Sequence, residues 1–189
     1  MKSIPSNLQK AGDPGANNAA KALSQLAHQS TKVITSEIKQ VPISDATKVL
    51  QPEGEVIVVY SQAFQGESQG VSLVVIQRHE ALALVDLLSG RAVGTTKIMK
   101  EIDRSALKEL TNILSNAYLT AICSQMGTAI NLSAPNLTPS ARIAKLIETL
   151  KATKKGEAIL FKTVIEMTTH KIKTNLFLLF HFGLVEIIK

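Results

Sequence analysis

The chain has 189 residues, enough for one domain with a sizeable core and too few for two full-sized domains. Its composition is 45% hydrophobic and 19% charged with a single cysteine, which excludes a disordered polar chain, a collagen-like chain and a disulfide scaffold. The formal net charge of +6 raises the possibility of nucleic-acid binding. However, the basic residues are dispersed and aromatic residues make up only 4%, so we expect a solvated basic surface and no nucleic-acid partner.

The first half of the chain alternates between helical and β-rich patterns. A long helical pattern comes first, and a hairpin follows later with the turn-like sequence QGESQG between its strands. The expected elements in chain order are a helix at 6–28, a short strand at 32–36, a helix at 43–50, strands at 55–65 and 71–77, and a helix at 79–90.

The second half repeats this order of elements. The expected elements are a helix at 103–127, a short strand at 128–133, a helix at 138–153, strands at 157–167 and 171–182, and the apolar tail GLVEIIK. An offset of 99 places Ser6 on Ser105, although few aligned residues are identical. We therefore predict one α+β domain, 1–189, built from two pseudo-repeats at about 1–92 and 93–189.

The sequence gives little sign of a membrane or metal protein. The start, MKSIPSNLQK, lacks the apolar core of a signal peptide, and the apolar stretch from Thr174 to Val185 is too short to span a bilayer. The four histidines have no short metal-ligand spacing, and Cys123 is the only cysteine. We expect a cytoplasmic protein with no membrane insertion and no metal of its own.

The helix expected at 103–127 places its polar residues on one face. With Ser105 at zero on a helical wheel, Glu109 falls near 40°, Asn112 near −20° and Asn116 near 20°, all approximate. The apolar residues occupy the opposite side and should face the sheet. Asp103 is placed to cap the helix N-terminus or to interact with its dipole. A carboxylate and a carboxamide one turn apart could bind one partner surface together. The same spacing also suits an ordinary solvated helix face, so periodicity alone leaves both interpretations open.

At these residues the chain resembles a known family. The motif S-x3-E-x2-N, formed by Ser105, Glu109 and Asn112 and followed after 22 residues by Pro135, is similar to the signature of the CheC/CheX/FliY phosphatases of chemotaxis. The surrounding SALKELTNILSNAYLTAI resembles the family's helix, and ANNAAKALSQL resembles the corresponding helix of its first repeat.

The resemblance implies an internally duplicated α/β domain with two long helices on one face of a roughly six-stranded, largely antiparallel sheet. It also implies hydrolysis of the aspartyl phosphate on CheY, a response-regulator receiver that holds the Mg²⁺, so that the phosphatase needs no cofactor of its own. By that analogy Glu109 pairs with the receiver's lysine and Asn112 orients the attacking water. Ser105, Asn116 and Pro135 support the motif, with Ser105 expected at or near the helix cap.

The first repeat departs from the family's pattern. Its motif positions are Ser6, Lys10 and Asp13, of which Lys10 would repel the receiver's lysine and Asp13 would be a poor water-orienting group. Gly12, Pro14 and Gly15 are expected to disturb the helix as well. We therefore predict that this first site is inactive.

The sequence also bears on the partners of the chain and on the alternative to an enzyme. The segment PSARIAKLIETLKATKKG lacks the pattern with which CheC binds CheD, which argues against that partnership, whereas a homodimer is possible by analogy with CheX. The alternative to a phosphatase is a non-enzymatic receiver-binding adaptor or a component of the flagellar switch or of signalling.

Overall fold

The computed structural model describes residue 4 and residues 6–50, 56–148 and 157–181. Its elements in chain order are α1 (Ser6–Ala27), β1 (Thr31–Pro42), α2 (Ile43–Leu50), β2 (Ile57–Gly66), β3 (Gly70–Gln77), α3 (Arg78–Leu88), α4 (Glu101–Met126), β4 (Ile130–Leu132), β5 (Asn136–Leu137), α5 (Ser140–Glu148), β6 (Glu157–Met167) and β7 (Lys173–His181). The expected helices and strands are present among the described residues. The end of the helix expected at 138–153 and the tail GLVEIIK lie outside them.

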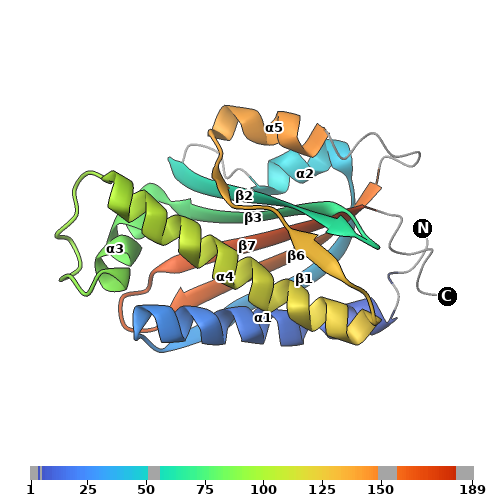
Figure 1. Cartoon of the computed structure of the whole chain (residues 1–189), viewed down its shortest axis with the longest axis horizontal. Helices are drawn as coiled ribbons and strands as arrows, with labels where there is room; N and C mark the ends of the chain where they lie inside the picture. The colour runs from blue at the N-terminus through green and yellow to red at the C-terminus, as the bar shows by residue number, and fades with distance from the viewer. Residues whose placement is uncertain (1–3, 5, 51–55, 149–156, 182–189) are drawn as a thin grey trace.

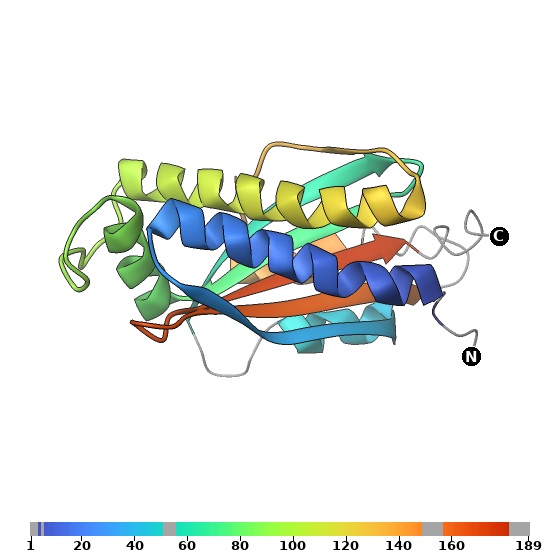
Figure 2. The same ribbon diagram turned by 90° about the horizontal axis from the view of Figure 1, so that it is seen from below.

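One antiparallel sheet organises the chain. Its strand order is β1-β6-β7-β3-β2-β4, and β5 also pairs with β2. The two long helices α1 and α4 lie side by side on one face, as Figures 1 and 2 show, and α2 and α5 lie on the other. The predicted α+β fold is confirmed, and the described residues form seven strands where about six were expected.

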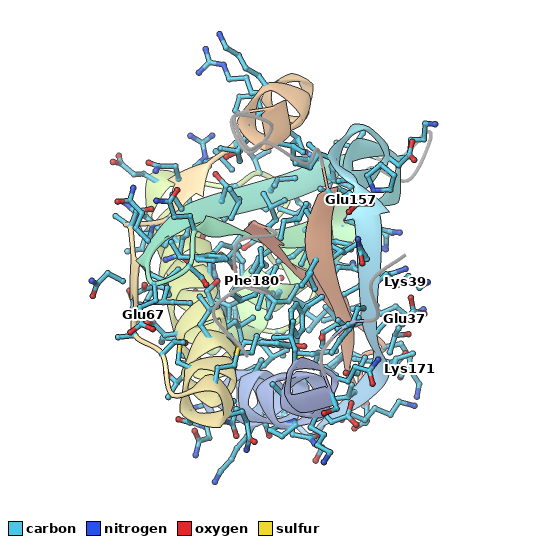
Figure 3. The ribbon with its side chains drawn as sticks, turned by 90° about the vertical axis from the view of Figure 1, so that its right-hand side faces the viewer. Glu37, Lys39, Glu67, Glu157, Lys171 and Phe180 are labelled. Carbon is cyan, nitrogen blue, oxygen red and sulfur yellow. The ribbon has the colours of Figure 1, made fainter. Side chains whose placement is uncertain are left out.

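Two cores lie on the two faces of the sheet. The larger core fills the space between the sheet and the helices α1, α3 and α4, and Phe180 lies in its middle in Figure 3. The smaller core lies under α2 and α5 and contains Ile43 and Ile143. Alternate residues of the central strands therefore contribute to different cores, which is why β3 is buried along nearly its whole length.

The order of helix, strand, helix and hairpin occurs twice in the structure. β6 and β7 pair with each other as β2 and β3 do, and β3 joins β7 at the centre of the sheet. β1 is much longer than the predicted 32–36 because it pairs with β6 along its length. The division into repeats at about residue 92 stays a prediction.

The expectation that Gly12, Pro14 and Gly15 disturb the first helix is wrong. α1 runs without a break from Ser6 to Ala27 with Pro14 inside it. The two glycines instead allow close packing: a Cβ atom on Gly15 would lie 2.6 Å from the ring of Tyr118 in α4, and one on Gly12 would lie 2.7 Å from Ile38 in β1. Packing against α4 and β1 therefore stabilises a helix that proline alone would weaken.

Candidate functional site

The outer face of α4 carries the residues that the motif singles out. Ser105, Glu109 and Asn116 are exposed, and Asn112 is half-buried. The leucines of the opposite side are fully buried in the larger core; these are Leu107, Leu110 and Leu114. The structure thus places the four polar side chains along one accessible strip of α4. The helix itself lies across one face of the sheet, as Figure 1 shows.

An ion pair between the half-buried Arg91 and the buried Asp103 holds the start of α4. The helix begins at Glu101, so Asp103 lies in its first turn and Ser105 in its second, and Ser105 is not the cap. The Asp103 carboxylate accepts hydrogen bonds from the Arg91 guanidinium at 2.6 Å and from the Lys100 main-chain N–H at 2.8 Å. The hydrogen bond from Arg91, with that from Lys100, lowers the pKa of the Asp103 carboxyl.

Asp86 organises the loop that leads into α4. Its fully buried carboxylate accepts hydrogen bonds from the Thr96 hydroxyl at 2.6 Å and from the main-chain N–H groups of Thr96 and Gly94. Burial raises the pKa of this carboxyl, but the hydrogen bonds from Thr96 and Gly94 outweigh burial, and the pKa lies below its ordinary value. Hydrogen bonds to the charged Asp86 carboxylate therefore hold the loop that precedes α4.

Asn112 belongs to a hydrogen-bond network that the sequence did not reveal. Its Oδ1 accepts from Gln62 Nε2 at 3.2 Å and from Asn116 Nδ2 at 3.1 Å. Asn116 Nδ2 also donates to the Asn112 main-chain carbonyl at 2.8 Å. Gln62 comes from β2 and is only 1% exposed. The sequence did contain one signal for Gln62. Tyr60, Gln62 and Phe64 are alternate residues of β2 and share one face of the strand, and only Gln62 among them is strongly polar.

The segment after α4 connects to the same network. β4 and β5 both pair with β2, and buried Pro135 lies between them. The Ser133 main-chain carbonyl accepts a hydrogen bond from Gln62 Nε2 at 2.9 Å. Pro135 therefore lies close in sequence to a contact of the network.

The corresponding positions of α1 are arranged differently. Ser6, Lys10 and Asp13 are all exposed on α1. Within the part of the chain that the structure describes, their side chains take part in no hydrogen bond or ion pair. The first set of motif positions is thus accessible, and no hydrogen bond among the described residues links these side chains to the sheet.

A hollow of about 440 Å³ adjoins the strip at the C-terminal end of α4. Asn116, Leu119, Cys123 and Ile130 are among the residues that line it. Over the described ranges, no group of three or more His, Cys, Asp or Glu residues could hold a metal ion. Over the same ranges, no helix has both the length and the hydropathy needed to cross a membrane.

Comparison with known proteins gives a sequence relative. Over 130 residues the chain is 27% identical to the flagellar motor switch phosphatase FliY of Bacillus subtilis. This match covers 67% of the chain and spans about a third (33%) of that relative's length. No protein-family model matches the chain.

Solved structures resemble the whole fold. FliY of Thermotoga maritima has a TM-score of 0.71 at 17% identity, covering 100% of this chain and 96% of that one. The FliM middle domain of Vibrio alginolyticus has a TM-score of 0.64 at 13% identity, covering 97% and 98%. The CheX chain from a CheX–CheY–BeF3–Mg²⁺ complex of Borrelia burgdorferi has a TM-score of 0.56 at 14% identity, covering 89% and 96%. The sequence relative and these folds together confirm the resemblance of the chain to the CheC/CheX/FliY family.

Proposed function

We propose that this protein hydrolyses the aspartyl phosphate of a CheY-like receiver, and that α4 carries the site. The observation that supports this most is the pairing of an exposed carboxylate, Glu109, with a half-buried carboxamide, Asn112, whose oxygen is already held by two hydrogen bonds. The names of the relatives are consistent with this class of activity, because one is a switch phosphatase and another comes from a complex of CheX with CheY.

In the proposed reaction, a water attacks the phosphorus atom in line with the bond to the receiver's aspartate. A new P–O bond forms from the water oxygen, and the bond between phosphorus and the carboxylate oxygen breaks. The carboxylate leaves with the electron pair, and the water proton passes to the released phosphate or to solvent. Asn112 would position this water without adding charge, because a carboxamide is neutral and forms directional hydrogen bonds.

Glu109 would supply the docking contact. An exposed carboxylate one helical turn from Asn112 can pair with the lysine of the receiver while the amide reaches the phosphoryl group. The Mg²⁺ that assists the reaction belongs to the receiver. A net charge of +6 would also favour encounter with an acidic receiver.

The test is phosphate release from a purified phospho-receiver. The wild-type protein should accelerate release above the receiver's own rate, and Asn112→Ala should lower that acceleration by about a hundredfold. Asn18→Ala, the same change at an exposed position of α1, is the matched control and should retain full activity. Binding without faster phosphate release in the wild type would favour the adaptor instead, and an active Asn112→Ala would remove Asn112 from the mechanism.

A further inference from the structure

We propose that Gln62 is a positioning residue that fixes the orientation of the Asn112 carboxamide. This inference rests on the proposed function for its consequence, but the orientation is a property of the free protein. Gln62 projects from β2 between Tyr60 and Phe64, which belong to the larger core, and it faces α4 directly beneath Asn112.

Two main-chain carbonyls, those of Ser133 and Asn112, determine where the oxygen and the NH2 group of each side-chain amide lie. The Ser133 carbonyl can only accept, so the Gln62 group beside it is the NH2 group. That NH2 group also contacts Asn112, so the Asn112 atom facing it is Oδ1. Asn116 leads to the same assignment independently. Its NH2 group donates to the main-chain carbonyl of Asn112, and the Asn112 side-chain atom beside that NH2 group must therefore be Oδ1.

The consequence is a single orientation of the Asn112 amide. Its oxygen faces inward to Gln62 and Asn116, so its NH2 group faces away from both. Among the described residues no hydrogen bond uses Asn112 Nδ2 as donor. Asn112 therefore offers N–H donors to a water or a phosphoryl oxygen of the bound receiver, and the amide does not need to be ordered again during the reaction.

The hydrogen bonding of Gln62 argues against a role in stability alone. Gln62 is 1% exposed, and its Oε1 is buried with no hydrogen-bond partner among the described residues. Such an acceptor destabilises the folded state, and an apolar side chain of the same shape would avoid that loss. Gln62 thus combines a destabilising acceptor with two donor contacts, to Asn112 and Ser133, and only the donor contacts are needed to orient Asn112.

The chain offers a matched control in Ser72. This residue lies opposite Gln62 in the β2–β3 register, is fully buried, and its hydroxyl forms a 2.6 Å hydrogen bond with that of Ser115 in α4. Ser72→Ala thus removes another buried polar link between the sheet and α4 without touching Asn112. Gln62→Met removes the donor while nearly conserving the shape of the side chain.

The first measurement is the NMR order parameter of the Asn112 side-chain NH2 group in the free protein. We expect a rigid value of about 0.8 in the wild type and in Ser72→Ala, and a value below about 0.6 in Gln62→Met. The melting temperature of Gln62→Met should stay within about 5 °C of the wild type, because the loss of two hydrogen bonds is offset by the loss of a buried acceptor without a partner. An order parameter that is unchanged in Gln62→Met would overturn the proposal.

The second measurement is steady-state hydrolysis of the phospho-receiver. Gln62→Met should lower kcat by about tenfold and leave KM within about twofold, because a buried residue cannot contact the partner. An equal loss in Ser72→Ala, or a rise in KM alone, would contradict positioning. A wild type without phosphatase activity would refute the proposed function, and the order parameter would still decide the role of Gln62.

Discussion

The two long helices occupy similar places on one sheet, but only α4 combines the motif with a supporting network. α4 has Glu109 and Asn112 on its exposed strip, and β2 beneath it contributes Gln62. α1 has Lys10 and Asp13 at the corresponding positions. β6 pairs in the other half as β2 does, and the middle of its core-facing row has Thr163 between apolar residues; Thr163 donates to the Tyr118 hydroxyl of α4.

The comparison shows that a long helix can stay continuous where its motif positions carry other residues. α1 is continuous despite Pro14, and Gly15 lets it pack closely on Tyr118. What α1 lacks is a suitable pair of side chains and a donor in the sheet that would hold one of them. The packing of α1 in this fold therefore does not depend on the motif residues of α4.

The largest effect is expected when α4 is given the residues of α1. In Glu109→Lys/Asn112→Asp, a lysine would repel the receiver's lysine and a carboxylate would repel the phosphoryl group. Accelerated phosphate release should fall by about a thousandfold or more, to the receiver's own rate. Circular dichroism should show unchanged helix content, since Glu109 is exposed and Asn112 lies at the edge of the core. Activity above a tenth of the wild type would contradict the assignment of the site to α4.

A smaller effect is expected from Glu109→Gln, which removes only the docking charge. KM for the phospho-receiver should rise by about tenfold while kcat changes little, and the salt dependence of kcat/KM should become weaker. Glu101→Gln makes the same change in the exposed first turn of the same helix and should have no such effect. Equal behaviour of the two variants would show that only general charge is involved.

The two long helices also differ in how they begin. α4 has Asp103 in its first turn and is preceded by a loop that Asp86 holds, whereas α1 has no acidic residue in its first turn. The folded-state pKa of Asp86 is lowered, so its contribution to stability is present above the unfolded pKa of about 3.9 and is lost as pH falls through the folded-state value. Asp86→Asn should lower Tm at pH 7 by about 5 °C and should flatten the dependence of Tm on pH below about 5. A variant that loses Tm on acidification as steeply as the wild type would exclude this role.

The smallest effect is expected when the motif is restored in α1. Lys10→Glu/Asp13→Asn should raise phosphate release by less than about twofold, because an exposed Asn at this position would gain no partner comparable to Gln62. The background should be the inactive Glu109→Lys/Asn112→Asp protein, so that a small gain is measurable. Substantial recovery there would mean that the two side chains alone distinguish the halves.

Local patterns predicted much of this molecule, and distant partners account for the rest. Hydrophobic periodicity located the long helices and both hairpins, and the wheel placed Glu109 and Asn112 on one face of a helix. The pairing of β1 with β6, the continuity of α1 through Pro14 and the contact of Gln62 with Asn112 all depend on residues brought together by folding. A single polar residue in an apolar strand row was visible in the sequence, but its partner was not.

The most direct test of the phosphatase assignment is a single-turnover experiment with the protein in saturating excess over a phospho-receiver, so that binding does not limit the rate. The wild type should release phosphate in a fast exponential phase. Asn112→Ala should bind with the same affinity and release phosphate about a hundredfold more slowly. Equal rates for the wild type and Asn112→Ala, or a wild-type rate no faster than the receiver alone, would contradict the account.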